Sequence, residues 1–475
     1  MSDSLKKKTV KGVRWSIIDN IGSRGITFIV GIFLARLLTP QDYGLIGVVS
    51  VFIALFNCLV DSGFSQALIR QKVVEDADYN SVFFLNIAVS IILIVILILT
   101  APIISMFYGS SELTDIIQIM SIIVLLYSLS IVQRSIIIRN VDFKKQTIIS
   151  LSASTISGIV GIGMALGGYG VWSLVWQQII KYTVDTSMLW IVNRWIPSFS
   201  ISIKRAGNLF SFGWKITLVN LIDAIWQQVR QAAIGKNSIA SLGYYTRSKQ
   251  FSDIFSENLL GVLNRVTYPV LSKIQDEDKR LCEAYTSVYR VTSFFCAIGL
   301  ASLAAMSEPL ILALLGDKWI TVIGYIPILC LSSYFLSIHK MHMNIIKVKG
   351  DSRNVLKYDV FRKVLLLIPL LISVFYGLLY FLWGEVAVGI IVFVFDGAFI
   401  SKMLNYKFFD QICHLKNSVL YASVFFMVMY ILSFLEIPYI MILTIQIATL
   451  FISFLGLLWK RPNLELVQLY NFLKK

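Results

Sequence analysis

Polar and charged side chains recur along one face of three apolar segments of this chain. The segments are residues 12–38, 209–232 and 243–270, and the polar positions in each follow at intervals of three or four residues, which places them on one helical face. They are Ser16, Asn20, Arg24, Thr27, Thr217, Asn220, Asp223, Gln227, Arg230, Gln250, Asp253, Glu257, Gly261 and Asn264. A charged side chain at the centre of a bilayer costs about 2.5 to 3.5 kcal/mol. The stripes therefore predict a shared aqueous cavity.

Basic residues in and beside these segments are the candidates for lining that cavity, and a structural ion pair is the alternative for each. They are Arg24, Lys215, Arg230, Arg247 and Lys249, with Asn20 and Gln227 as neutral neighbours. Other basic residues lie near the ends of apolar segments, where long side chains reach the headgroups, and these are not site candidates. They are Arg36, Arg134, Arg362 and Lys363.

Other kinds of chemistry have weak support. His339 and His342 are three residues apart, but a metal site needs further ligands, so packing is the favoured interpretation. The five cysteines show no CxxC spacing, and no GxxxxGK motif is present for phosphate binding. We expect no metal and no organic cofactor. Any step that requires energy would then depend on the gradient of a coupling cation, Na⁺ or H⁺, or on the gradient of a substrate itself.

The composition is that of an all-α, polytopic integral membrane protein. Hydrophobic residues make up 57% and charged residues 15% of the chain, and the mean hydropathy is +0.76, whereas soluble domains carry about a quarter charged residues. Segments of roughly 20 apolar residues, long enough to span a bilayer, number fourteen. They lie near residues 12–38, 43–69, 80–108, 113–138, 146–167, 171–193, 209–232, 243–270, 284–308, 320–346, 357–380, 383–402, 417–435 and 437–459.

The basic residues also predict an orientation. With the first segment beginning in the cytoplasm, 27 of the 42 Lys and Arg residues fall in inner segments, and only Lys236 and Lys318 fall in outer loops. Cytoplasmic loops keep positive charge, so both termini are expected to be cytoplasmic. The net charge of +15 is thus a topology signal and predicts no nucleic-acid partner.

An internal repeat divides the chain. An offset of 199 residues aligns Trp15 with Trp214 and Gly44 with Gly243, six segments apart. An even number of spans between copies makes them parallel, related by an axis along the membrane normal. We expect two six-helix lobes, residues 1–200 and 201–402, followed by two further helices in residues 403–475 with a cytoplasmic tail.

Seven motifs in a fixed order carry a resemblance to a known family. They are ARLLTPQDYGLIGVV at 35, GFSQALIRQK at 63, NVDFKK at 140, GGYGVWSLV at 167, GYYTRSKQ at 243, TYPVLSKIQDE at 267 and LLGDKW at 314. Over residues 5–350 the chain resembles the polysaccharide-export flippases of the O-antigen, colanic-acid and teichuronic-acid type, within the multidrug/oligosaccharidyl-lipid/polysaccharide superfamily. The resemblance implies fourteen helices, a V-shaped cavity and alternating access in the bacterial inner membrane.

The resemblance also implies a substrate, an oligosaccharide on undecaprenyl pyrophosphate that moves from the cytoplasmic to the outer leaflet. Arg is well suited to phosphate through bidentate contacts, which makes Arg24 and Arg247 the first choices. Relatives that flip the cell-wall precursor have a sodium site among spans seven, eleven and twelve, where this chain offers Asp223, Asp359 and Asp396. Glu257 is a further candidate for coupling, and the repeat pairs Arg24 with Asp223 as a hypothetical gate.

Two alternatives remain open. A multidrug-type cation antiporter of the same superfamily would be expected to have fewer cationic cavity positions and twelve spans. A polysaccharide polymerase or glycosyltransferase would need a large extramembrane loop with catalytic residues, and the longest outer loop, near residues 233–242, is too short for one. We therefore expect a transporter and not an enzyme, with membrane lipids and the polymerase and glycosyltransferases of polysaccharide synthesis as partners.

Overall fold

The computed structural model describes residues 3–71, 74–140, 142–193, 195–200 and 202–460. Within them the chain forms seventeen α-helices and one short 3₁₀ helix. The helices are α1 (Asp3–Leu37), α2 (Pro40–Asp61), α3 (Phe64–Arg70), α4 (Asp76–Tyr108), α5 (Glu112–Met120), α6 (Ile122–Arg139), α7 (Phe143–Leu166), α8 (Trp172–Val192), α9 (Ile203–Asn237), α10 (Ile239–Lys273), α11 (Asp278–Ala305), α12 (Ser307–Leu314), η1 (Asp317–Trp319), α13 (Ile320–Val348), α14 (Ser352–Tyr376), α15 (Leu378–Leu404), α16 (Phe408–Leu432) and α17 (Tyr439–Lys460).

Local sequence signals set several helix starts. Thr39 caps α2: Asp42 N donates to the Thr39 side chain at 3.3 Å and Thr39 N donates to the Asp42 carboxylate at 2.8 Å, with Pro40 in the first turn. This capping box satisfies two backbone donors that the helix itself leaves unpaired. Asp351 caps α14 as an acceptor only, and hydrogen bonds from the side chain and the backbone N–H of Asn354 lower the pKa of its carboxyl. Asp351 is therefore an anion at the helix N-terminus, where negative charge is favoured.

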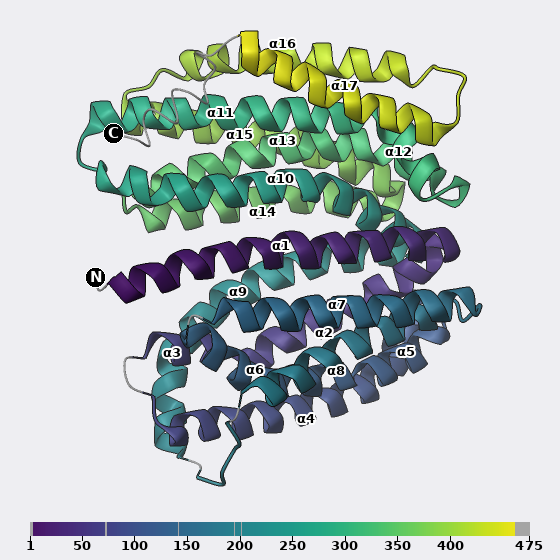
Figure 1. The fold of residues 1–475 in the computed structure, drawn as a ribbon, viewed down its shortest axis with the longest axis vertical. Helices are drawn as coiled ribbons and strands as arrows, with labels where there is room; N and C mark the ends of the chain where they lie inside the picture. Colours follow the sequence, from purple (N-terminus) through teal and green to yellow (C-terminus); the bar gives the residue numbers. More distant parts are fainter. Residues whose placement is uncertain (1–2, 72–73, 141, 194, 201, 461–475) are drawn as a thin grey trace. The chain divides into compact units, whose positions relative to one another are not determined.

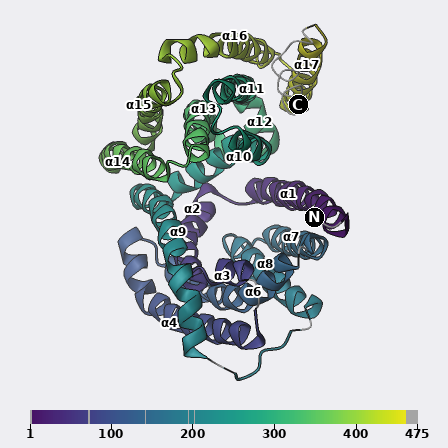
Figure 2. The same ribbon diagram turned by 90° about the vertical axis from the view of Figure 1, so that its left-hand side faces the viewer.

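The chain divides into two compact units, Met1–Gly243 and Tyr244–Lys475. In the first unit, long helices run nearly parallel (Figure 1). Seen along their axes, α6 lies among its neighbours α3, α4 and α8, and α1 packs along α7 (Figure 2). In the most apolar stretch of the α5–α6 segment 56% of the residues are buried, whereas in the corresponding stretch of α4 only 28% are buried. The α6 helix is therefore the core element of the first unit, and α4 presents a broad apolar surface.

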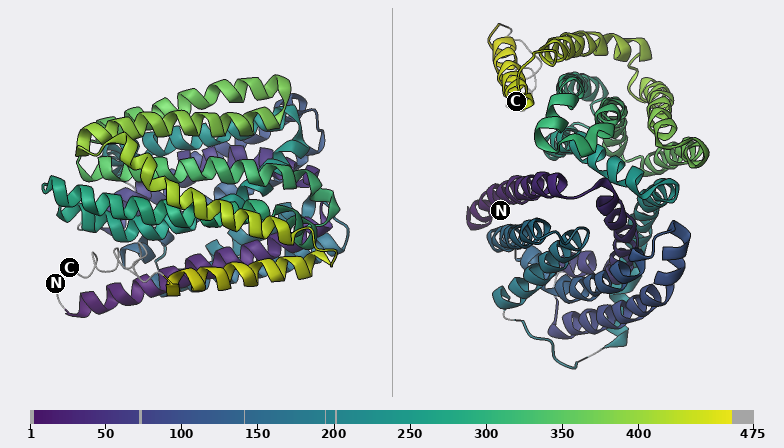
Figure 3. Two further views of the ribbon diagram at one scale, coloured as in Figure 1. Left: turned by 90° about the horizontal axis from the view of Figure 1, so that it is seen from above. Right: turned by 90° about the vertical axis from the view of Figure 1, so that its right-hand side faces the viewer.

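The second unit is built around α11 and α13, which pack against each other, with α16 on α11 and α15 on α13. Two views show these helices also running close to parallel within the unit (Figures 1 and 3). In the most apolar stretch of α11, 72% of the residues are buried. Side chains that project outward from α15 and α16 include exposed aromatics such as Trp383 and Phe409. Apolar exposure on this scale fits helices that face lipid.

The all-α membrane fold predicted from the sequence is confirmed. Every one of the fourteen expected spans overlaps a helix, and within the described residues eight helical segments are long and apolar enough to cross a membrane. These eight segments are Pro40–Arg70, Asp76–Tyr108, Glu112–Arg139, Phe143–Leu166, Asp278–Ala305, Asp317–Val348, Leu378–Leu404 and Phe408–Leu432. Spans predicted over α1, α9 and α10 mix charged residues into the apolar pattern, as the sequence indicated.

The first compact unit extends beyond the expected lobe boundary at residue 200. It includes α9, which packs on α2, α3 and α4. The lobes expected at 1–200 and 201–402, and the separate segment 403–475, describe the repeat in the sequence and stay predictions.

Candidate functional site

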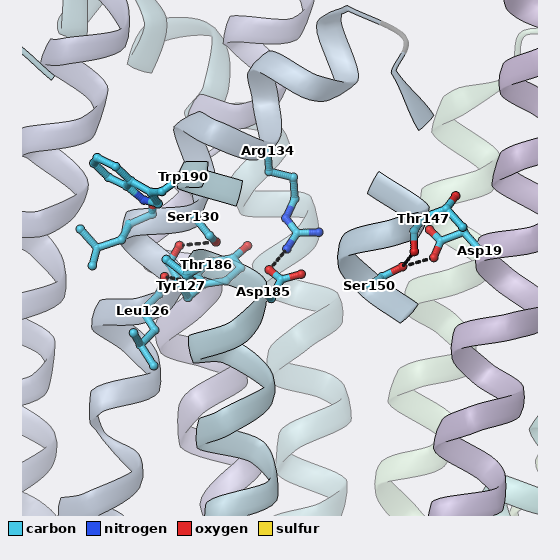
Figure 4. Close-up of polar contacts among 11 residues, drawn as sticks. Asp19, Leu126, Tyr127, Ser130, Arg134, Thr147, Ser150, Asp185, Thr186 and Trp190 are labelled. Atoms are coloured by element: carbon cyan, nitrogen blue, oxygen red, sulfur yellow. Dashed lines mark hydrogen bonds and ion pairs between the residues drawn. The ribbon is translucent and has the colours of Figure 1, made fainter. Parts of the chain in front are cut away.

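An ion pair inside the helix bundle is the centre of the candidate site in the first unit. Arg134 of α6 reaches Asp185 of α8 and donates from Nη2 to Oδ2 (Figure 4). The Asp185 side chain is 15% exposed and that of Arg134 37% exposed. Asp185 also interacts electrostatically with Lys181 of the same helix and with Asp19 of α1. The structure therefore differs from the sequence-based expectation for Arg134, because its charge is matched by a carboxylate inside the protein rather than by lipid headgroups.

Side-chain to backbone hydrogen bonds fix the register of α8 against α6. Thr186 Oγ1 donates to the carbonyl of Leu126 at 3.0 Å, and Trp190 Nε1 donates to the carbonyl of Leu129 at 3.1 Å (Figure 4). Hydrogen bonds of this kind between apolar helices orient one helix on another. They therefore keep Arg134 and Asp185 at the same level along the axes of α6 and α8.

A second contact joins α1 to α7 beside this pair. The hydroxyl of Ser150 donates to Asp19 Oδ1 (Figure 4). Thr147 Oγ1 donates to the carbonyl of Trp15 at 3.0 Å. Small residues allow this close approach: a Cβ on Gly158 of α7 would lie only 2.4 Å from Val30 Cγ2. The α1–α7 pair is thus tightly packed and carries a carboxylate on its polar face.

Two more groups extend the site toward α2. Tyr127 of α6 interacts electrostatically with both Asp61 and Arg134. Asp61 accepts hydrogen bonds from the backbone N–H of Ser65 at 3.1 Å and from its hydroxyl at 2.8 Å. We call the set the polar cluster of the first unit: Asp19, Asp61, Tyr127, Arg134, Lys181 and Asp185.

Lys181 is the most informative member of the polar cluster. It lies at the middle of α8, between Trp172 and Val192, and its side chain is exposed. The sequence predicts a membrane span over residues 171–193, and an ammonium group at the midpoint of such a span is costly against lipid, so we expect Lys181 to face water or protein. Sequence reasoning missed Lys181 and Asp185 because it searched for long polar stripes, although two charges four residues apart in an otherwise apolar segment are themselves a signal.

The cations of the cluster lie near carboxylates, and their side chains stay partly exposed. Arg134 and Lys181 supply two positive charges, and Asp19, Asp61 and Asp185 supply three negative charges. A partly exposed Arg offers several N–H donors in a planar fork that suits phosphate as well as carboxylate. Chemically, the site can exchange a carboxylate partner for an incoming anion.

The structure places the residues predicted from the sequence in several different settings. Arg24 on α1 and Gln227 on α9 are exposed, and Arg230 is half-buried. Arg247 is 9% exposed and donates to Gln250 Oε1 at 2.5 Å, while Lys249 pairs with Asp253 at 2.6 Å. The side chains of the remaining candidates lie outside the described residues, so the gate pair stays a prediction. These are Asn20, Lys215, Asp223 and Glu257.

The two carboxylates of the second unit that were predicted for coupling differ in their surroundings. Asp359 of α14 pairs with Lys363 at 2.7 Å and lies 3.5 Å from Arg362. These two basic residues were expected to reach the headgroups, and the structure shows them instead beside a carboxylate of their own helix. Asp396 of α15 is fully buried and contacts His339 of α13. Among the described residues no group of three or more His, Cys, Asp or Glu side chains could hold a metal ion.

Comparison with known proteins identifies the family. A family model described as "Polysaccharide biosynthesis protein" matches residues 33–324, more than half of the chain. The chain belongs to this family. Among curated members, it is 26% identical over 339 residues to the succinoglycan biosynthesis transport protein ExoT of Rhizobium meliloti (strain 1021), covering 71% of this chain and 69% of that protein. It is 22% identical over 376 residues to the lipopolysaccharide biosynthesis protein WzxC of Escherichia coli (strain K12), covering 78% and 75%.

Solved structures support the same placement at the level of the fold. The lipid II flippase MurJ in an inward closed conformation superposes with a TM-score of 0.74 at 16% identity, over 94% of this chain and 99% of that chain. An inward-facing multidrug resistance transporter of the MATE family superposes with a TM-score of 0.63 at 13% identity, over 83% and 99%. This member of the polysaccharide biosynthesis protein family is thus a multi-pass membrane protein with a transporter fold.

Proposed function

We propose that this chain is a flippase that moves an oligosaccharide linked to undecaprenyl pyrophosphate from the cytoplasmic to the outer leaflet of a bacterial inner membrane. The observation that carries the proposal is the polar cluster: two cations, Arg134 of α6 and Lys181 of α8, lie beside the carboxylate of Asp185 on helices of a transporter fold. Relatives whose names record polysaccharide transport and lipopolysaccharide biosynthesis support the choice of substrate class.

The physical difficulty of the reaction lies in the headgroup. A diphosphate bearing sugars must cross about 30 Å of hydrocarbon, and an unpaired charge there is unfavourable. In the proposed mechanism Asp185 compensates Arg134 while the site is empty, and a phosphate oxygen replaces that carboxylate when substrate enters. Alternating access of the two lobes then exposes the headgroup to the other side.

Several further features belong to this proposal. Both termini are cytoplasmic, the chain performs no covalent chemistry, and a coupling cation, Na⁺ or H⁺, supplies the driving force. Arg24, Lys215, Arg230, Arg247 and Lys249, with Asn20 and Gln227, line the substrate path. The polymerase and glycosyltransferases that extend the sugar chain act beside it in the membrane.

Gene deletion with complementation tests the proposal in cells. Without the chain, lipid-linked oligosaccharide should accumulate and surface polysaccharide should be lost, and wild-type protein should restore both. A Lys181→Gln variant should restore export poorly. Removing one hydrogen bond to a charged group costs about 1.5 to 3 kcal/mol, which corresponds to roughly a ten- to hundredfold loss.

The matched control is Lys145→Gln, because Lys145 pairs at 3.2 Å with Asp142 at the exposed start of α7 and exposed pairs contribute little. It should export normally. If deletion leaves surface polysaccharide unchanged but abolishes efflux of a cationic dye such as ethidium, the multidrug-antiporter alternative holds and the flippase proposal fails.

A further inference from the structure

A carboxylate and two imidazoles are enclosed together inside the second unit. Asp396 of α15 lies 2.6 Å from His339 Nδ1 and 3.8 Å from His342 Nδ1, both of α13. The Asp396 and His342 side chains are 0% exposed and that of His339 is 5% exposed. Both helices belong to the segments apolar enough to cross a membrane. We call these three residues the Asp396 cluster.

The cluster is incompletely hydrogen-bonded. Within the described part of the chain, Asp396 Oδ1 and both ring nitrogens of His342 have no hydrogen-bond partner. A buried polar group without a partner costs about 1 to 3 kcal/mol. Buried polar groups that lack a hydrogen-bond partner, and titratable groups in unusual surroundings, often belong to functional sites.

Two aromatic rings lie against His342 in near-parallel orientation. Its ring lies parallel to the ring of Tyr289 at 5.9 Å and 11°, and to the ring of Phe393 at 6.2 Å and 18°. The faces of aromatic rings attract cations. An imidazolium at His342 would therefore lie near two aromatic faces and 3.8 Å from a carboxylate oxygen.

The other titratable and polar groups around the cluster come from three helices and one connecting segment. They are Tyr285 and Tyr289 of α11, Tyr358, Asp359, Arg362 and Lys363 of α14, Gln411 of α16, and Tyr406 before α16. Arg362 and Lys363 together balance Asp359 and Asp396 when both histidines are neutral. One additional proton is then the smallest change that alters the charge of the site.

We propose that the Asp396 cluster is a proton-binding site, and that, if the proposed transport function holds, its proton couples to substrate movement. In the resting state the proton on His339 Nδ1 is shared with Asp396 Oδ2. A second proton, delivered by hydronium, binds His342 and places a positive charge 3.8 Å from Asp396 Oδ2. No bond other than this N–H bond forms, and release of the proton to water reverses the step.

A proton fits this site better than a metal cation. Hard cations such as Ca²⁺ take six to eight oxygen ligands, whereas the nearest neighbours of Asp396 are imidazole nitrogens. Protonatable chains of Asp, Glu and His are a common means of moving protons through membrane proteins. The Asp396 cluster belongs to the second unit and the polar cluster to the first, so different residues can be altered to test each one.

The chain contains only three histidines, which makes a direct test practical. Full-length protein labelled with ¹⁵N-histidine and held in lipid nanodiscs can be titrated by NMR between about pH 5 and 8.5, the range in which histidine changes charge. His339 and His342 should titrate as a coupled pair in the wild type. In Asp396→Asn both transitions should shift, while His414, which contacts Arg290 at 2.8 Å, should keep its own.

The wild-type titration alone can overturn the proposal, even if the variant fails to fold. If His339 and His342 both stay neutral over the whole range, the cluster binds no proton in that range and the proposal fails. A shift of His414 equal to that of the pair would show that Asp396→Asn acts through general damage, which also contradicts it.

Coupling is tested separately from flipping in proteoliposomes that contain the dye pyranine. The probe is undecaprenyl-pyrophosphate-linked oligosaccharide extracted from the producing strain. Wild-type protein should move protons with substrate, and Asp396→Asn should lose about tenfold or more of that proton movement while still exchanging substrate. Flipping without proton movement overturns the coupling but leaves the proposed function intact, whereas histidine titration without flipping overturns the proposed function and leaves the proton site.

Discussion

Gly44 of α2 and Gly243 of α10 make a reciprocal contact within the first unit. A Cβ on Gly44 would lie 1.8 Å from the carbonyl oxygen of Ile239, and a Cβ on Gly243 would lie 2.0 Å from that of Pro40. Each glycine thus faces the residue four positions before the other. Pro40 and Ile239, like Gly44 and Gly243, are 199 residues apart, which is the offset that aligns Trp15 with Trp214.

Alanine at either glycine should destabilise the protein. The added carbon would collide with a backbone oxygen, which cannot rotate away as a flexible side chain can, and overpacking typically costs about 1 to 3 kcal/mol or more. Gly44→Ala and Gly243→Ala should each lower the melting temperature in detergent and the yield of monodisperse protein. Gly163→Ala is the control, because nothing lies within 4 Å of its Cβ position. Equal behaviour of all three variants would contradict the close crossing of α2 and α10.

The ion pair between Arg134 and Asp185 should be visible in a double-mutant cycle. Arg134→Gln and Asp185→Asn each leave one charge without its partner, and we expect each to reduce the free energy of unfolding by about 1.5 to 3 kcal/mol. The double variant should lose little more than one single variant, since coupled residues are not additive. Denaturant unfolding in detergent measures this. Additive losses would indicate that the two residues act independently.

Two arginines of α1 allow a substrate contact to be distinguished from a general structural role. Arg24 and Arg36 are both exposed on α1, but only Arg24 belongs to the polar stripe. Arg24→Ala should reduce polysaccharide export by about tenfold or more at normal expression, whereas Arg36→Ala should have a much smaller effect. Similar losses from both variants would argue for structural damage and against a substrate contact at Arg24.

Contacts within each unit agree with the predicted sidedness of the loops. Lys236, in an expected outer loop, donates to the carbonyl of Phe107 at 2.5 Å, and Phe107 lies at the outer end of the expected span 80–108. Lys349 contacts Asp278 at 2.5 Å, and both lie in segments expected inside. Reporter fusions at Lys236 and Lys349 should therefore report the outside and the cytoplasm, respectively. The reverse result at either position would mean that the number of spans before it is wrong.

Helices, their approximate ends and the class of protein could be predicted from the sequence, because long apolar segments and capping signals such as the Thr39–Asp42 pair act locally. The partners of the buried charges could not. Arg134 and Asp185 are 51 residues apart, and nothing in the local pattern shows that α6 and α8 pack side by side. The same holds for His339 and Asp396, 57 residues apart, although His339 and Asp396 were each noted from the sequence.

Lys181 and Asp185 were not predicted as site residues for one physical reason. A search for polar stripes finds helices that line a wide cavity over several turns, as in residues 12–38. It passes over sites made from one or two charges on each of several helices, such as Lys181 and Asp185. Such sites can be recognised from sequence by any charge near the middle of an apolar segment, because lipid does not tolerate it there.

The sidedness of the lipid-linked sugar tests the central claim most directly. Purified protein is reconstituted into vesicles that carry undecaprenyl-pyrophosphate-linked oligosaccharide with a fluorescent label on the sugar, and an impermeant quencher is added outside. Without protein only the outer-leaflet label, about half, should be quenched. With wild-type protein quenching should proceed toward completion, and with Lys181→Gln it should be about tenfold or more slower. If quenching in the presence of active, folded protein stops at the same level as in empty vesicles, the chain does not flip this lipid and the account is wrong.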